Sequence, residues 1–160
     1  MAFSFGGEFQ VERSADEVYR FLTDPQKFCP LLPDFQSMDL RDATHFTVKL
    51  NVGISHIRGT AEIKMELAKA EPAKRAQYKG QGTVAGGNVT MTAGFDLSPA
   101  GDGTRVQWKG EAQVVGRIIS MAGGLLEPLA KKNIQRLIDA LQNALNAGAV
   151  AQSAGELHRG

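Results

Sequence analysis

The chain has 160 residues and a mass of 17.2 kDa, which fits a single domain. Its 42% hydrophobic and 22% charged residues exclude a wholly disordered protein. The 18 Lys and Arg against 17 Asp and Glu leave a net charge of +1, which argues against a nucleic-acid-binding protein, because such proteins concentrate basic charge on one face.

The N-terminal residues predict a strand followed by a short helix. Between Ala2 and Val11, apolar and polar side chains alternate, which is typical of a strand with one buried face. Ser14 and Glu17 then form a capping box, in which each side chain can satisfy a free amide at the start of a helix. The helix ends at Asp24-Pro25, because the residue before a proline disfavours helical dihedral angles.

The next segment, residues 26–34, combines prolines with large apolar residues. Pro30 and Pro33 prevent a long helix or a central strand there. Its apolar side chains are Phe28, Leu31 and Leu32. They either cover the edge of the core or form an apolar lip at the mouth of a cavity or a patch facing a membrane.

From Phe35 onward the sequence predicts one antiparallel strand after another. Apolar and polar residues alternate over residues 46–52, 57–67, 77–84, 89–97 and 106–114. Short turn signals join these segments. With the first strand, they predict an antiparallel sheet of six or seven strands with one face in water.

The C-terminal part changes to a helical pattern. Residues 118–122 indicate one or two helical turns, which Gly123-Gly124 interrupt. Pro128 suits the first turn of a second helix, whose apolar residues recur every three or four positions up to Leu145. Residues 1–145 are therefore expected to form one domain. Residues 146–160 lack periodicity, and we expect them to be a disordered tail.

Small residues occupy the middle of the apolar strand faces. They are Gly59, Ala61, Gly80, Gly82, Ala93, Gly110 and Ala112. A close-packed core does not leave its centre unfilled, because cavities cost stability. Either the long helix presses close to the sheet there, with glycines that help the sheet to curve, or the sheet encloses a space. We interpret the pattern as a cavity.

The apolar strand faces carry almost no ionisable group. Acid–base, nucleophilic or metal chemistry needs carboxylates, histidines or an activated thiol in the cavity. Tyr78 and Trp108 are the only side chains of these faces with a polar tip, and the single cysteine, Cys29, has no histidine near it in sequence. His45, His56 and His158 lack the spacing of metal ligands. The residues predict a container for an apolar molecule, without a cofactor, rather than an enzyme.

Several short motifs follow one another in a recognisable order. They are Ser14-Ala-Asp-Glu-Val18, Asp24-Pro25, Thr47-Val-Lys-Leu-Asn-Val-Gly53, Arg58-Gly59, Tyr78-Lys-Gly-Gln-Gly82, Gly101-Asp-Gly-Thr-Arg105 and Val114-Val-Gly116. In this order, up to about residue 145, the chain resembles the carbon monoxide dehydrogenase G-subunit family of the START-like (SRPBCC) helix-grip superfamily. It departs from the family pattern at Pro33-Asp34, where Pro-Gly is common, and at residues 54–57, which lack Gly-Pro.

The resemblance implies an α+β helix-grip fold: a curved antiparallel sheet wrapped on a long C-terminal helix, with two short helices after the first strand. It also implies an accessory protein of a molybdenum hydroxylase or carbon monoxide dehydrogenase-type oxidoreductase, which aids membrane recruitment of that enzyme or supplies lipophilic electron acceptors. We therefore expect the cavity to bind a quinone or another isoprenoid-type lipid.

The other expectations concern location and partners. We expect a cytoplasmic monomer or homodimer with at most peripheral contact with the inner face of a membrane and with no nucleic-acid partner. Two alternatives remain: a polyketide cyclase- or dehydratase-like enzyme, which the same fold supports, and a protein-docking module with a filled core.

The residues expected to line the ligand site combine the lip, the inward-facing strand residues and the C-terminal helix. They are Phe28, Leu31, Leu32, Val48, Leu50, Gly59, Ala61, Ile63, Tyr78, Gly80, Gly82, Met91, Ala93, Phe95, Trp108, Gly110, Ala112, Met121, Leu125 and Leu129. No catalytic or metal-binding residue is predicted.

Overall fold

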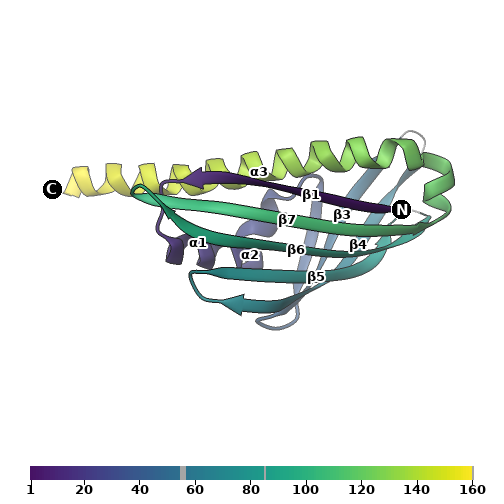
Figure 1. Ribbon diagram of the computed structural model, residues 1–160, viewed down its shortest axis with the longest axis horizontal. Coiled ribbons are helices and arrows are strands. Elements are labelled where there is room, and N and C mark those ends of the chain that lie inside the picture. Colours follow the sequence, from purple (N-terminus) through teal and green to yellow (C-terminus); the bar gives the residue numbers. More distant parts are fainter. Residues whose placement is uncertain (55–56, 85, 160) are drawn as a thin grey trace.

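An antiparallel sheet, three short helical segments and a long C-terminal helix make up the fold (Figure 1). The computed structural model describes residues 1–54, 57–84 and 86–159, with side chains up to residue 147. His56 and the side chain of His158 lie outside this part of the chain.

The elements follow the order that the residue pattern predicts. They are β1 (Ala2–Val11), α1 (Ala15–Leu22), α2 (Pro25–Phe28), the 3-10 helix η1 (Cys29–Leu31), β2 (Phe35–Leu40), β3 (His45–Ile54), β4 (Ile57–Glu71), β5 (Arg75–Val84), β6 (Gly87–Ala100), β7 (Gly103–Gly116) and α3 (Arg117–Arg159). The described strands form one seven-stranded sheet in the order β1-β7-β6-β5-β4-β3-β2. All neighbouring strands are antiparallel, which confirms the predicted fold class.

The start of α1 is capped largely as its sequence predicts. The Ser14 hydroxyl oxygen accepts a hydrogen bond from the Glu17 amide at 3.2 Å. The Glu17 carboxylate accepts from the Ser14 hydroxyl and pairs with Arg13, instead of reaching back to the Ser14 amide. This cap positions α1 so that Val18 and Leu22 are buried in the core.

Helix α3 consists of two helical stretches that meet at a kink, as the sequence predicts. The kink is at Ala122 (φ −145°, ψ 18°), directly before Gly123-Gly124, and the second stretch already contains both glycines. Pro128 therefore lies inside the second stretch, so the prediction that it stands in the first turn of that helix was wrong. Ile118, Ala122 and Leu126 are buried in one cluster, and such packing maintains helical structure that local propensity alone would not. The helix continues to Arg159, and the disordered tail after residue 145 stays a prediction.

The buried residues form three clusters. The α1 cluster joins α1 and the far part of α3 to the sheet through Phe9, Val11, Val18, Leu22, Ala76, Phe95, Val106, Leu141 and Leu145. The α3-start cluster contains Phe3, Ile54, Val114, Ile118, Ala122 and Leu126. The aromatic cluster contains Cys29, Phe46 and Tyr78, against which Phe28 packs. Two of these clusters lie toward opposite ends of α3, and the central stretch of the sheet beneath the helix lies between them.

Candidate functional site

The strand register places small residues side by side on the face of the sheet that packs against α3. Gly110 of β7 pairs with Phe5 on one side and with Ala93 on the other. In the next row, Ala112 pairs with Phe3 and Met91. Gly110, Ala93 and Ala112 therefore form one contiguous patch, which we call the small-residue floor.

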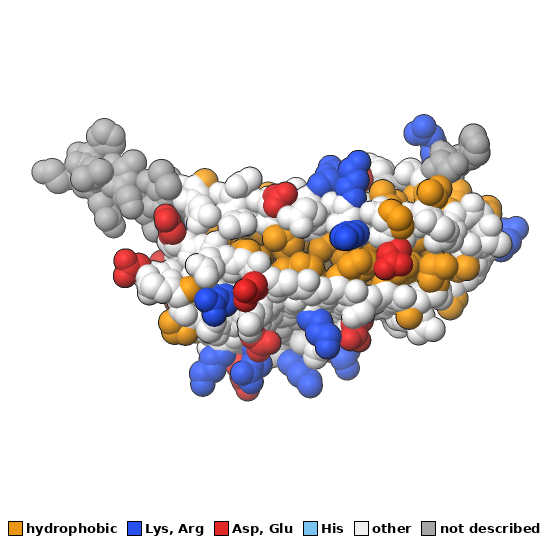
Figure 2. All heavy atoms as spheres, turned by 45° about the horizontal axis from the view of Figure 1, so that its top comes forward, with side chains coloured by type: hydrophobic (Ala, Val, Ile, Leu, Met, Phe, Trp, Pro, Cys, Tyr) orange, Lys and Arg blue, Asp and Glu red, His pale blue; other side chains and the backbone are white. Residues whose placement is uncertain are grey.

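The small-residue floor is only partly covered: Ala112 packs against the α3-start cluster, whereas no side chain outside its neighbours in the chain lies within 4 Å of a Cβ built on Gly110. A Cβ on Gly110 would have the Thr92 carbonyl oxygen, 3.9 Å away, as its nearest atom outside the neighbouring residues of the chain. Ala93 and Ala112 are only half-buried, although both belong to the apolar face. Leu129 of α3, which belongs to the opposite wall, is half-buried too. Figure 2 shows a band of hydrophobic side chains along α3, between the helix and the sheet.

Gly80 and Gly82, which were predicted to line the same space, have a different environment. A Cβ on Gly80 would lie 2.6 Å from Met65 Sδ and 2.9 Å from Met91 Cγ, so the two methionine side chains cover this glycine. A Cβ on Gly82 would overlap the Glu62 carbonyl oxygen. At both positions, close approach of neighbouring atoms accounts for the glycine.

The three residues of the predicted lip pack against the core. The Phe28 ring lies 5.7 Å from the Tyr78 ring and 6.0 Å from the Phe46 ring, measured between centroids. Leu31 packs against the α1 cluster, and Leu32 packs against the aromatic cluster. The short helices α2 and η1 thus cover this part of the interior.

At the other end of the interior, away from α2 and η1, the start of α3 exposes apolar side chains. Met121 is 55% exposed and Leu125 is 50% exposed, and both lie in the first turns of α3. They lie next to the α3-start cluster. An apolar molecule therefore meets more exposed apolar surface at this end of the interior than at the end that α2 and η1 cover.

The remaining predicted lining residues are spread over four strands. Val48 and Ala61 are buried, Leu50 and Ile63 are half-buried, and Gly59 is exposed. Phe95 is buried in the α1 cluster, and Trp108 packs against that cluster. Close contacts of α3 with the sheet involve mainly β1, β7 and β6. The residues of β3 and β4 therefore lie away from the small-residue floor.

The polar groups of the interior are few and un-ionised. The Tyr78 hydroxyl donates a hydrogen bond to the Leu22 carbonyl at 2.8 Å, and burial raises its pKa. Burial, with a smaller contribution from the Asp24 carboxylate, raises the pKa of the Cys29 thiol to about 12. Among the described residues no charged side chain is buried, and the buried Thr104 donates to the Arg13 carbonyl. This arrangement suits an apolar guest better than acid–base chemistry.

Sequence reasoning missed two hollows on the polar face of the sheet. One has a volume of about 880 Å³ and the other about 530 Å³. Side chains of both charge signs line the larger hollow, among them Lys64, Glu66, Lys79 and Glu111. These charged side chains are exposed to water, and an apolar molecule in the hollow would have to displace that water. The hollow is therefore a poor binding site for such a molecule. No sequence signal marks it, because its lining residues come from strands that lie far apart along the chain.

The sheet curved against one long helix defines a protein of the START-like helix-grip class. The chain belongs to the CoxG family, named for the G subunit of carbon monoxide dehydrogenase, and the family pattern matches residues 7–146. This confirms the resemblance seen in the sequence. Among curated protein sequences, none matches the chain.

Solved structures share the fold at low sequence identity. A conserved protein from Geobacillus kaustophilus is 21% identical, with a TM-score of 0.78 over 89% of this chain and 95% of that one. The protein TTHA0849 from Thermus thermophilus is 15% identical, with a TM-score of 0.66 over 91% and 99% of the two chains. The di-domain aromatase/cyclase StfQ of the steffimycin biosynthetic pathway is 12% identical, with a TM-score of 0.66 over 94% of this chain and 53% of StfQ. These likenesses establish the fold alone.

Proposed function

We propose that this protein binds an apolar ligand, a quinone or another isoprenoid lipid, between α3 and the small-residue floor without transforming it. The observation that carries the proposal is the contiguous patch of Gly110, Ala93 and Ala112, which is incompletely covered in an interior of the described chain without buried charge. An apolar ligand would complete the packing that the side chains leave unfinished.

The energetics allow such a ligand to stay bound during purification. Burial of about 300 Å² of an isoprenoid tail contributes roughly 7 kcal/mol at ~25 cal/mol/Å², before the cost of association is subtracted. The half-buried side chains along the site, such as Phe5 and Leu129, would become fully buried at the same time.

Family membership supports a partner for this carrier. The CoxG family takes its name from carbon monoxide dehydrogenase, and we propose that the protein serves a molybdenum hydroxylase-type oxidoreductase of this kind as an accessory. A lipophilic electron acceptor would then be the cargo. No helix in the described part of the chain combines the length and hydrophobicity that a membrane crossing requires.

StfQ has a similar fold, but the residues of the interior support a cyclase-like activity less well than they support ligand binding. The Tyr78 hydroxyl is engaged by the Leu22 carbonyl, and the thiol of Cys29, with its raised pKa, stays protonated at neutral pH. Neither group is poised to move a proton or to attack a substrate.

The test is to identify the lipid that the protein carries. The untagged protein is purified from a host that makes quinones, extracted with organic solvent, and the extract is analysed by mass spectrometry. Ala112→Leu places extra bulk on the floor, whereas Gln113→Leu, one residue away on the exposed polar face, is the matched control. We expect the wild type and Gln113→Leu to carry lipid and Ala112→Leu to lose most of it. An empty wild-type extract would favour the docking module instead.

A further inference from the structure

We propose that the indole N–H of Trp108 donates a hydrogen bond to a carbonyl oxygen in the head group of the bound ligand, whose tail runs along the small-residue floor toward Leu125. This inference rests on the proposed function and deepens it, because it names the polar group that the ligand must carry.

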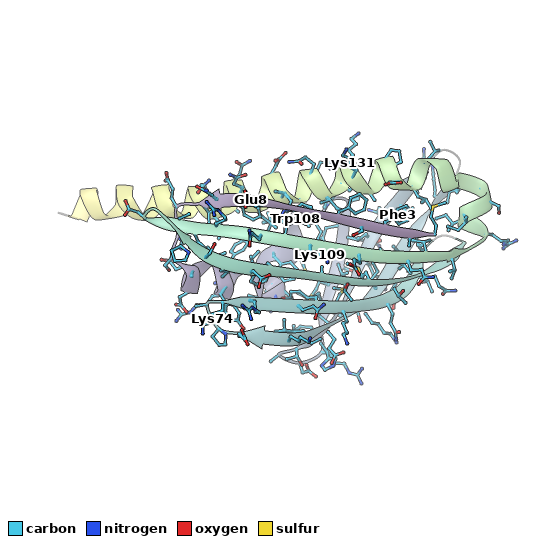
Figure 3. The ribbon with its side chains drawn as sticks, viewed as in Figure 1. Phe3, Glu8, Lys74, Trp108, Lys109 and Lys131 are labelled. Carbon is cyan, nitrogen blue, oxygen red and sulfur yellow. The ribbon has the colours of Figure 1, made fainter. Side chains whose placement is uncertain are left out.

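The position of the indole comes from its pairing with a glycine. Trp108 of β7 pairs with Gly7 of the edge strand β1. A Cβ on Gly7 would lie 3.0 Å from Cζ2 and 3.2 Å from Nε1 of Trp108, so the edge of the indole that carries the nitrogen lies over Gly7. Figure 3 shows Trp108 on β7 beside β1, below α3. The absence of a side chain at Gly7 therefore leaves room for the indole over β1, the edge strand that contacts α3.

The indole N–H has no protein partner among the described residues, whereas the buried hydroxyls nearby do. The Tyr78 hydroxyl donates to the Leu22 carbonyl, and the Thr104 hydroxyl donates to the Arg13 carbonyl. Trp108 is half-buried and its nitrogen is not among the buried atoms that lack a partner, so the donor is accessible to a guest.

The chemistry of indole selects the ligand class. Its nitrogen donates a hydrogen bond and cannot accept one, so its partner must bear an acceptor oxygen. In an apolar surrounding, an unpaired donor is costly and a paired one is strengthened. A ligand with a carbonyl on its ring, as in a quinone, is therefore favoured over a hydrocarbon of the same shape.

The direction of the tail follows from the order of residues on β7. Trp108, Gly110 and Ala112 face the same side at two-residue steps, and Val114 continues the row. At about 3.4 Å per residue the row from Trp108 to Val114 is ~20 Å long. It leads from the indole, across the floor, to the α3-start cluster, next to which Leu125 is half exposed.

Two probes separate recognition of the head group from binding of the tail. Decylubiquinone carries ring carbonyls, and n-decylbenzene has a similar chain without an acceptor. Because Trp108 is the only tryptophan of the chain, its fluorescence reports on wild-type binding directly, and isothermal titration calorimetry gives the affinity of every variant. Trp108→Phe keeps an aromatic ring and removes the N–H group.

We expect Trp108→Phe to weaken decylubiquinone roughly 3- to 10-fold, the worth of one hydrogen bond, and to leave n-decylbenzene unchanged. Gly7→Ala, which displaces the indole without removing it, is the second variant and should act in the same direction. Lys109→Gln changes the neighbouring residue, which is exposed on the other face of the sheet, and serves as the control.

The outcomes distinguish the two proposals. Suppose that both probes bind the wild-type protein. If Trp108→Phe then changes the two affinities equally, or changes neither of them, the head-group assignment is overturned while the proposed function stands. If neither probe binds the wild-type protein, the binding site itself is refuted, and the role of Trp108 with it.

Discussion

Two glycines on the same apolar face should respond in opposite ways to the same substitution. Gly110 of β7 and Gly82 of β5 are both within strands and both face the interior. In Gly110→Ala the new methyl group would enter open space, with the Thr92 carbonyl oxygen 3.9 Å away. In Gly82→Ala it would overlap the Glu62 carbonyl oxygen and lie 2.8 Å from Ile63 Cα.

The expected magnitudes follow from these surroundings. Glycine within a strand costs about 0.5–1 kcal/mol relative to alanine, because it loses more conformational freedom on folding. Gly110→Ala should recover that free energy and raise the free energy of unfolding. Gly82→Ala forces two backbones apart, and overpacking of this kind costs about 1–3 kcal/mol. The difference between the free energies of unfolding of the two variants is then roughly 1.5–4 kcal/mol, the sum of the two effects.

Urea unfolding followed by the fluorescence of Trp108 and by circular dichroism measures both free energies of unfolding. Coincident transitions by the two probes would establish two-state behaviour. A loss of about 1 kcal/mol or more in Gly110→Ala would mean that atoms fill the space above it, and the small-residue floor would no longer be an argument for a ligand. Equal effects at both glycines would refute the reasoning as well.

Two further predictions concern the polar groups of the interior. Tyr78→Phe leaves the buried Leu22 carbonyl without its donor and should cost about 1–3 kcal/mol in urea unfolding, whereas an unchanged midpoint would mean that water replaces the hydroxyl. Cys29, with its pKa raised from 9.0 to about 12, should not react with a thiol reagent at about pH 8 until the protein unfolds; rapid modification of the folded protein would contradict its burial. Because the folded protein binds this proton more tightly, its contribution to stability is present below pH 9 and is lost as the pH rises from 9 toward 12.

The sequence by itself determined the elements and their faces. Alternation along residues 46–52 and the later segments predicted the strands, and the same parity separated interior from exterior side chains. Ser14 marked the start of α1, and its side chain accepts the capping hydrogen bond. Asp24-Pro25 marked the end of α1, and the structure shows in addition that Asp24 caps α2. These features can be predicted from the sequence because they depend on residues only a few positions away along the chain.

The tertiary structure alone decided how these elements meet. The first strand pairs with the last, so that Gly7 lies beside Trp108, 101 positions later in the chain. Helix α3 kinks at Ala122 instead of breaking at Gly123-Gly124, and the buried Ala122 and Leu126 flank the two glycines. Gly110 and Gly80 look alike in sequence, yet one is uncovered and the other lies beneath two methionines. Residue type fixes the size of a side chain, whereas the space around it depends on atoms brought there from distant parts of the chain.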